Sequence, residues 1–169
     1  MLPRRCAPCP QLAPQLFQVM VDRHLADRDI GRVRLRFYAN EHIGEMAVEE
    51  RQVETGRIRL ASRETTLVDL VIHPDQAGGL SNIATVIVEI GDLDVPALAQ
   101  LASVRSRSVA RRLGWLLERF RDDLDLESLR DLALAAGGYP TRLVRALPAR
   151  GPIDTGWNLQ VNSSVEPDL

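Results

Sequence analysis

The sequence predicts an α+β fold in which a small, mostly antiparallel sheet packs against about five helices. The first observation is the pattern of residues 32–38 and 56–61, where arginine alternates with apolar residues as in half-buried strands. The second is the change at Ser62, after which apolar residues recur at helical spacing. The third is the alternation of residues 157–162, which predicts a last strand that returns to the N-terminal strands.

Three segments before Ser62 have the composition or alternation of short strands. They are residues 16–22, 32–38 and 56–61. Residues 27–31 supply turn-forming residues between the first two segments. Because successive side chains of a strand point to opposite faces, Arg32, Arg34 and Arg36 are expected to share one face, opposite an apolar face.

The first two helices are predicted from their ends. One helix begins after Ser62, whose side chain can cap it, and ends before Pro74. Gly78 and Gly79 can then turn the chain at positive φ. The following run, residues 80–90, fits either a helix or a buried strand, and its length and polar start favour the helix.

Three more helices are predicted from caps and apolar stripes. Asp94 with Pro96 marks the start of a short helix, and residues 107–120 carry the most regular apolar stripe. Asp125 is expected to cap a last helix, which ends before a glycine pair. Residues 138–156 are expected to be irregular.

Length and composition predict one main domain. A chain of 169 residues with 45% hydrophobic residues can bury one core and is short for two domains of ordinary size. Residues 1–14 are rich in proline and lack periodicity, so we expect an irregular leader before a domain at residues 15–169. No apolar run approaches the roughly 18 to 20 residues that span a bilayer, and no signal peptide is apparent. We therefore expect a cytoplasmic protein without membrane contact.

The charge of the chain limits the functions that it can have. Its net charge is −2, so nucleic-acid binding would require a local basic patch. All 21 basic residues are arginine. The lack of lysine excludes Schiff-base chemistry and the lysine clamp of a P-loop, whereas guanidinium groups suit phosphates and carboxylates.

Residues with catalytic or metal-binding chemistry are few and scattered. Cys6 and Cys9 form a lone C-A-P-C motif in the leader, where we expect neither a zinc site nor a redox dithiol. The histidines lie apart, and no hydrolase or phosphate-loop motif is present. Asp69 is a candidate base, but a structural role beside a threonine or an arginine is favoured. We therefore expect no catalytic residue, metal or cofactor.

Two groups of arginines are candidate contact sites for nucleic acid or for a partner. One group follows the strand at residues 32–38, and the other lies at residues 103–112, where arginine alternates with serine at a helix start. Guanidinium groups and helix N-termini commonly hold phosphate oxygens. The alternative is a solvated face whose arginine stems cover apolar surface. The candidates are Arg32, Arg34, Arg36, Arg105, Arg107, Arg111 and Arg112.

Several sequence blocks, in their order along the chain, resemble the C-terminal domain of AbiEi-family antitoxins. They include T-L-V-D-L, A-G-G-L-S-N-I-A and R-L-G-W-L-L-E, and the resemblance covers about residues 14–169. These antitoxins belong to type IV toxin–antitoxin and phage abortive-infection systems. The resemblance implies a mixed α and β domain that is required for antitoxicity and adds basic surface to operator binding. It also implies a nucleotidyltransferase-like toxin, which the antitoxin opposes without forming a stable complex.

The resemblance further implies a winged-helix DNA-binding domain before this one. Only MLPRRCAPCPQLA stands in its place, so we expect a truncated gene, a misplaced start or a domain that works alone. Autorepression would need the missing module, because that module reads base edges. The expected function is a non-enzymatic antitoxin that neutralises its toxin and contributes to DNA binding. The alternatives are a truncated remnant that acts only as a protein-interaction domain, and a hydrolase or nuclease.

Overall fold

The computed structural model describes residues 15–39, 43–45, 48–54, 56–135 and 137–168. The predictions for residues 1–14, including those for Cys6 and Cys9, lie outside the described residues. The chain divides into two compact units, Met1–Glu45 and Met46–Leu169.

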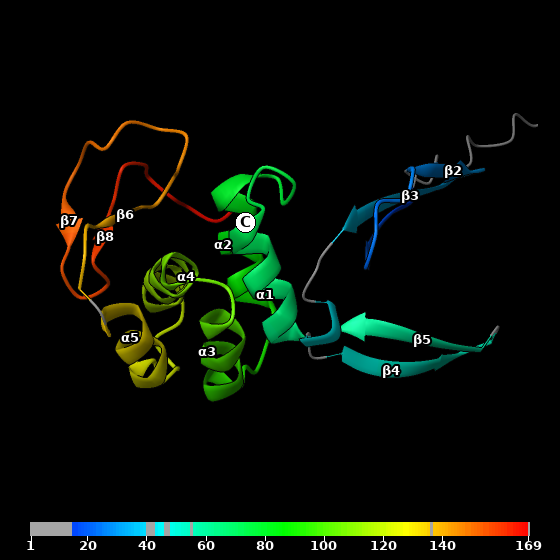
Figure 1. The fold of residues 1–169 in the computed structure, drawn as a ribbon, viewed down its shortest axis with the longest axis horizontal. Helices are drawn as coiled ribbons and strands as arrows, with labels where there is room; N and C mark the ends of the chain where they lie inside the picture. Colours follow the sequence, from blue (N-terminus) through cyan, green and yellow to red (C-terminus); the bar gives the residue numbers. More distant parts are fainter. Residues whose placement is uncertain (1–14, 40–42, 46–47, 55, 136, 169) are drawn as a thin grey trace, which may run out of the picture. The chain divides into compact units, whose positions relative to one another are not determined.

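A three-stranded sheet forms the first unit. Its strands are β1 (Gln15–Val21), β2 (Arg28–Ile30) and β3 (Val33–Ala39), in the order β1-β3-β2 (Figure 1). β2 and β3 form an antiparallel hairpin, in which Gly31 turns the chain with a φ of 61°. The 3-10 turn η1 (Ile43–Glu45) follows the sheet.

The pairing of β1 with β3 is parallel, which differs from the antiparallel arrangement that the sequence predicts. Residues 27–31, predicted as a turn, contain β2, and β2 occupies one edge of β3. β1 therefore pairs with the other edge of β3. Because β2 runs opposite to β3, the chain turns twice between β1 and β3, and these two strands run in the same direction.

An antiparallel hairpin begins the second unit. Its strands are β4 (Val48–Val53) and β5 (Gly56–Ala61). β5 confirms the strand predicted at residues 56–61. The sequence pattern does not indicate β4, because VEERQV lacks a regular alternation of apolar and polar residues.

Five helices follow in the described part of the chain, and they confirm the five predicted helices. They are α1 (Arg63–Ile72), α2 (Gly79–Glu89), α3 (Val95–Ser103), α4 (Arg107–Phe120) and α5 (Glu127–Leu134). The Oγ of Ser62 accepts the N–H of Thr65 at 3.2 Å and so caps α1. Asp94 caps α3 in the same way. Gly78 and Gly79 have φ angles of 79° and 90°, which explains the glycine pair before α2.

Three two-residue strands form a separate sheet near the C-terminal end. They are β6 (Thr141–Arg142), β7 (Ile153–Asp154) and β8 (Leu159–Gln160), in the order β6-β8-β7. The prediction that residues 157–162 return to the N-terminal strands is therefore wrong. The reason is Trp157, which is fully buried and donates its Nε1–H to Glu118 of α4 at 2.7 Å. This contact anchors the segment to the helices.

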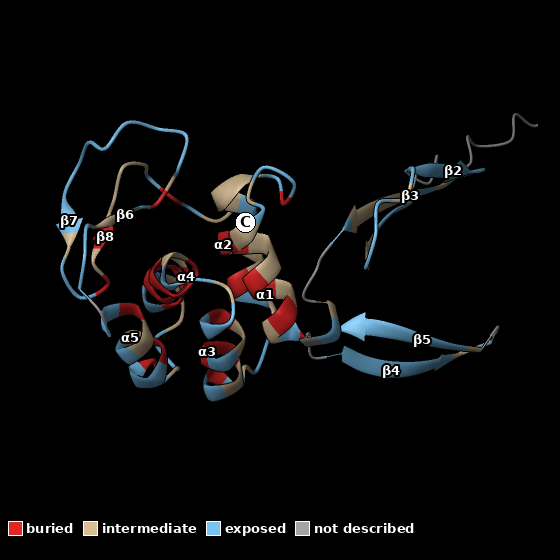
Figure 2. Cartoon of the chain, viewed as in Figure 1, coloured by how far each residue is buried: buried red, intermediate tan, exposed pale blue. Residues whose placement is uncertain are grey.

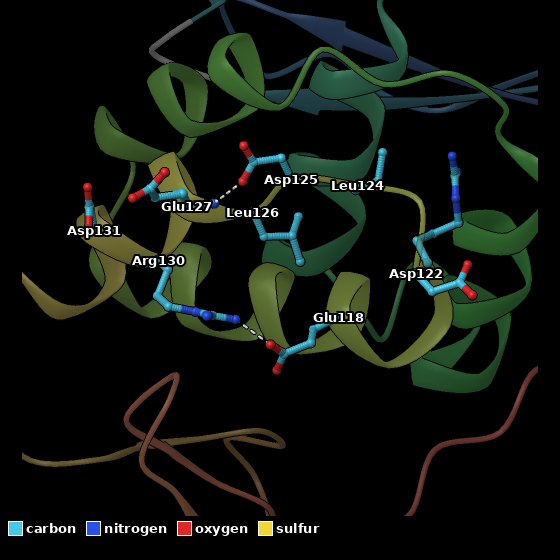
Figure 3. A pocket seen from close by; sticks show the side chains of 9 residues that line it. Glu118, Asp122, Leu124, Asp125, Leu126, Glu127, Arg130 and Asp131 are labelled. Carbon is cyan, nitrogen blue, oxygen red and sulfur yellow. Dashed lines mark hydrogen bonds and ion pairs between the residues drawn. The ribbon is translucent and has the colours of Figure 1, made fainter.

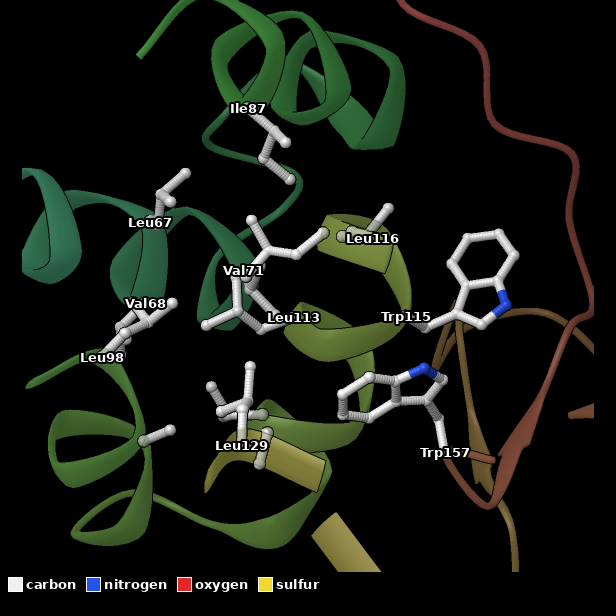
Figure 4. Packing of buried hydrophobic residues seen from close by; sticks show 14 of the residues in the cluster. Leu67, Val68, Val71, Ile87, Leu98, Leu113, Trp115, Leu116, Leu129 and Trp157 are labelled. Carbon is white, nitrogen blue, oxygen red and sulfur yellow. The ribbon is translucent and has the colours of Figure 1, made fainter. Parts of the chain in front are cut away.

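The fold is thus α+β, as predicted, and its hydrophobic core lies among the helices (Figure 2). Leu67, Ile87, Leu98 and Leu113, from four different helices, are fully buried (Figure 4). Among the described residues, no apolar side chain before Leu67 is buried, so the core belongs to the helical unit. No described helix combines the length and apolar character that a membrane crossing requires.

Candidate functional site

The candidate arginines of the first unit differ in their surroundings. Arg36 forms ion pairs with Asp27, at 3.4 Å, and with Asp29, at 2.8 Å. The hydrogen bond to Asp29 raises the pKa of Arg36. Arg34 in β3 and Arg32 in the turn before it are exposed and have no ion pair within the described residues. Arg32 and Arg34 are therefore the candidates of this unit that can meet an external anion.

Arg111 is held inside the second unit. Its side chain is 5% exposed, and its guanidinium donates to the carbonyls of Ala133 (2.9 Å), Gly137 (2.8 Å) and Tyr139 (3.0 Å). Its Nη1 also donates to the Oγ1 of Thr141 at 3.3 Å. These acceptors lie in the last turn of α5 and in the segment after it, so Arg111 ties both to α4. Most of its N–H groups are already engaged within the chain.

The other arginines near the start of α4 are more open. Arg112 is partly buried, and its Nε donates to the carbonyls of Arg142 (2.9 Å) and Leu143 (3.1 Å). Arg105 is also partly buried. Burial raises the pKa of Asp69 in α1 and lowers that of His73 at the C-cap of α1, and the positive charge of Arg105 acts to lower both pKa values. Arg107 is exposed, in the first turn of α4. Arg107 is therefore the residue of this group that faces solvent most openly.

Asp69 lies on α1 and is partly buried. Burial raises its pKa to about 6, and the positive charge of Arg105 opposes this rise. The hydroxyl of Thr66, three residues earlier, donates to the carbonyl of Ser62 at 2.8 Å. At the C-cap of α1, burial and then the charge of Arg105 lower the pKa of His73. Arg105 thus acts on both titratable groups of this helix end.

Replacing Asp69 by asparagine is expected to stabilise the protein at neutral pH. The folded-state pKa of about 6 lies above the ordinary value of 3.8, so the native state holds this proton more tightly than the unfolded state does. Stability therefore falls as pH rises from about 4 to about 6, and asparagine removes this loss. At about pH 8 we expect a gain in the free energy of unfolding of about 1 to 3 kcal/mol.

Urea unfolding at about pH 8 and about pH 4 measures this gain, which should nearly vanish at the lower pH. Asp75→Asn is the matched control, because Asp75 is exposed in the loop after α1. An equal gain for both variants, or a gain that does not depend on pH, would contradict burial of the Asp69 carboxylate as the cause.

A pocket of about 600 Å³ lies between the end of α4 and α5 (Figure 3). It is lined by Glu118, Arg121, Asp122, Leu124, Asp125, Leu126, Glu127, Arg130 and Asp131. Its carboxylates point in different directions around the rim. Within the described residues, no group of three or more His, Cys, Asp and Glu side chains could hold a metal ion.

The two arginines of this pocket are engaged within the chain. Arg130 pairs with Glu118 and lies over the ring of Trp157, with 4.9 Å from its guanidinium carbon to the ring centroid. Arg121 forms two hydrogen bonds with Asp123, at 2.7 and 2.8 Å. The polar groups of the pocket therefore hold α4, α5 and the segment around Trp157 together.

Sequence reasoning did not indicate Arg142 and Arg145, although both lie beside Arg112 in the structure. They belong to residues 138–156, which lack the periodicity that marks an ordered element. The one available signal is the density of arginine in TRLVRALPAR.

The chain matches a known protein family. The model described as AbiEi antitoxin C-terminal domain matches residues 10–119, which is more than half of the chain. The matched residues include β1 at one end and nearly all of α4 at the other. Comparisons with curated proteins and with solved structures gave no match. The chain therefore belongs to the AbiEi family of antitoxins, which act in toxin–antitoxin systems.

Proposed function

We propose that the protein is the antitoxin of a type IV system and opposes a nucleotidyltransferase-like toxin in the cytoplasm, without catalysing a reaction. The observation that carries this proposal is the family match over residues 10–119. The surroundings of the polar residues support a non-catalytic role. Arg111 and Arg121 hold segments of the chain together, and the positive charge of Arg105 opposes the rise that burial causes in the pKa of Asp69.

Growth rescue tests the proposal directly. The full chain is co-expressed with the toxin that is encoded beside its gene, and we expect growth to be restored. Gly114→Ala is the control for loss of folded protein, because the added methyl group collides with Trp157. Continued growth arrest at a normal level of folded wild-type protein would count against the antitoxin assignment.

We further propose weak, sequence-independent DNA contact through Arg32, Arg34 and Arg107, the exposed members of the predicted set. Each lost phosphate contact lowers the slope of log affinity against log salt by about 0.9, so replacing all three by alanine should lower it by about 2 to 3. Fluorescence anisotropy of a labelled duplex at several salt concentrations measures the slope. Arg36→Ala is the matched control, because the charge of Arg36 is already paired with Asp27 and Asp29.

A second candidate function is an antitoxin domain that works by protein contact alone. The net charge of −2 favours it, as do the contacts that engage Arg36 and Arg111 within the chain, because fewer of the predicted arginines then remain for phosphate. Growth rescue without DNA retention at low salt would support this candidate.

A further inference from the structure

A cluster of three arginines lies where α4 meets the C-terminal segment. Arg112 of α4 donates through Nε to the carbonyl of Arg142, and its two Nη atoms have no hydrogen-bond partner within the described residues. Arg145 is exposed, three residues beyond Arg142. The Nε of Arg112 also donates to the carbonyl of Leu143 at 3.1 Å, so the guanidinium of Arg112 lies against the segment that carries Arg142 and Arg145. Burial lowers the pKa of Arg112, and the charges of Arg145 and Arg142 lower it further.

The loop that carries Arg142 and Arg145 is fixed by hydrogen bonds from Asn162 and from Arg142 itself. Asn162 accepts the N–H of Val144 at 2.9 Å and donates to the carbonyl of the same residue at 2.9 Å. It also donates to the carbonyl of Leu147 at 3.3 Å. The Nη1 of Arg142 donates to Leu147 at 2.9 Å. The backbone of the loop is therefore preorganised, which lowers the ordering cost of binding a ligand there.

No carboxylate neutralises this cluster among the residues that the structure describes. Arg112, Arg142 and Arg145 form no ion pair there, whereas Arg36 and Arg121 each pair with an aspartate. Guanidinium groups held near one another repel, and a bound anion removes that repulsion. Planar guanidinium groups with free Nη atoms match the oxygens of a phosphate group.

We propose that Arg112, Arg142 and Arg145 form a binding site for phosphate groups. The site uses different residues from the proposed DNA contact, and two of its three arginines lie beyond the residues matched by the antitoxin family. The phosphate can come from a nucleic-acid backbone or from a free nucleotide. The site does not depend on the proposed antitoxin function.

Two probes distinguish the sources of phosphate. The full chain is titrated with a labelled DNA duplex by fluorescence anisotropy, and with ATP by calorimetry. We expect Arg142→Ala/Arg145→Ala to lower the affinity for a bound probe about tenfold, because two charge-assisted hydrogen bonds are lost. For DNA, the salt slope should fall by about 2. Arg112 is left unchanged, because its Nε holds the loop.

The matched controls are single replacements in the same segment. Arg145→Ala removes an exposed side chain that makes no hydrogen bond or ion pair within the described residues, and it should lower the salt slope by about 1. Arg150→Ala removes the same charge from another exposed position and should leave affinity within about twofold. Circular dichroism confirms that each variant is folded.

The outcomes either support the site or overturn it. Loss of binding in the double variant supports it. If DNA alone binds, the site recognises the nucleic-acid backbone; if ATP also binds, it recognises the phosphate groups of a free nucleotide. The site is wrong if neither probe binds at low salt, if the double variant binds like wild type, or if Arg150→Ala loses as much affinity as Arg145→Ala. Growth rescue remains a separate test of the antitoxin function in each of these cases. The Arg32, Arg34 and Arg107 variants remain a separate test of DNA contact wherever the duplex binds.

Discussion

Replacing Gly114 by alanine is expected to destabilise the helical unit by about 2 to 4 kcal/mol. A Cβ on Gly114 would lie 2.0 Å from Cζ3 of Trp157, and 2.4 Å from two further ring carbons. Trp157 is fully buried, so the clash is relieved only if the indole leaves its place. Loss of a buried tryptophan from a core costs about 3 to 5 kcal/mol, which the better helix propensity of alanine offsets by about 1.

Chemical denaturation of four proteins measures this coupling. In the Trp157→Ala background the indole is absent, so Gly114→Ala should no longer destabilise and should add a few tenths to about 1 kcal/mol of stability. Gly44→Ala is the control, because a Cβ there meets no atom within 4 Å. Additive losses from Gly114→Ala and Trp157→Ala would show that the indole does not exclude a side chain at residue 114.

Gly114 illustrates which parts of this fold can be read from the sequence. A cap, an apolar stripe and a glycine pair are local features, so the predicted helix at residues 107–120 has the bounds of α4. The glycine inside α4 lowers helix propensity, and nothing nearby in the sequence explains it. Its reason is Trp157, which is distant along the chain and lies against Gly114 in space.

Strand pairing was predictable only where it depended on local pattern. The alternation in residues 56–61 correctly predicts β5, whereas β4 lacks such a pattern and is specified by its hairpin with β5. The parallel pairing of β1 with β3, and the separate sheet around β8, depend on which edges and anchors other segments supply. Such non-local contacts leave little trace in a single sequence.

The candidate arginines show a similar limit of prediction from a single sequence. Sequence spacing identifies a run of arginines at a helix start, but it does not separate an exposed guanidinium from one that already has acceptors. Arg107 and Arg111 are one helical turn apart, yet one is exposed and the other is 5% exposed. The difference arises from carbonyls more than 20 residues further along the chain.

Arg111→Ala is the second change with a large expected effect, a loss of about 3 kcal/mol in the free energy of unfolding. The substitution removes donors from the carbonyls of Ala133, Gly137 and Tyr139 and leaves a gap beside α4. Arg111→Lys should fall between wild type and alanine, because an ammonium group cannot reproduce the planar fork of donors. Urea denaturation measures both losses.

Arg107→Ala, one turn earlier on the same helix face, is the matched control and should change stability by no more than about 0.5 kcal/mol, because Arg107 is exposed. DNA retention should show the opposite order, with the larger effect at Arg107. Under conditions where each variant is folded, Arg107→Ala should lower the salt slope and Arg111→Ala should leave it unchanged. The opposite result would be an Arg111→Ala variant that is as stable as wild type and has a lower salt slope. Arg111 would then be a phosphate contact, and its hydrogen bonds to α5 and to the segment after it would not stabilise the helical unit.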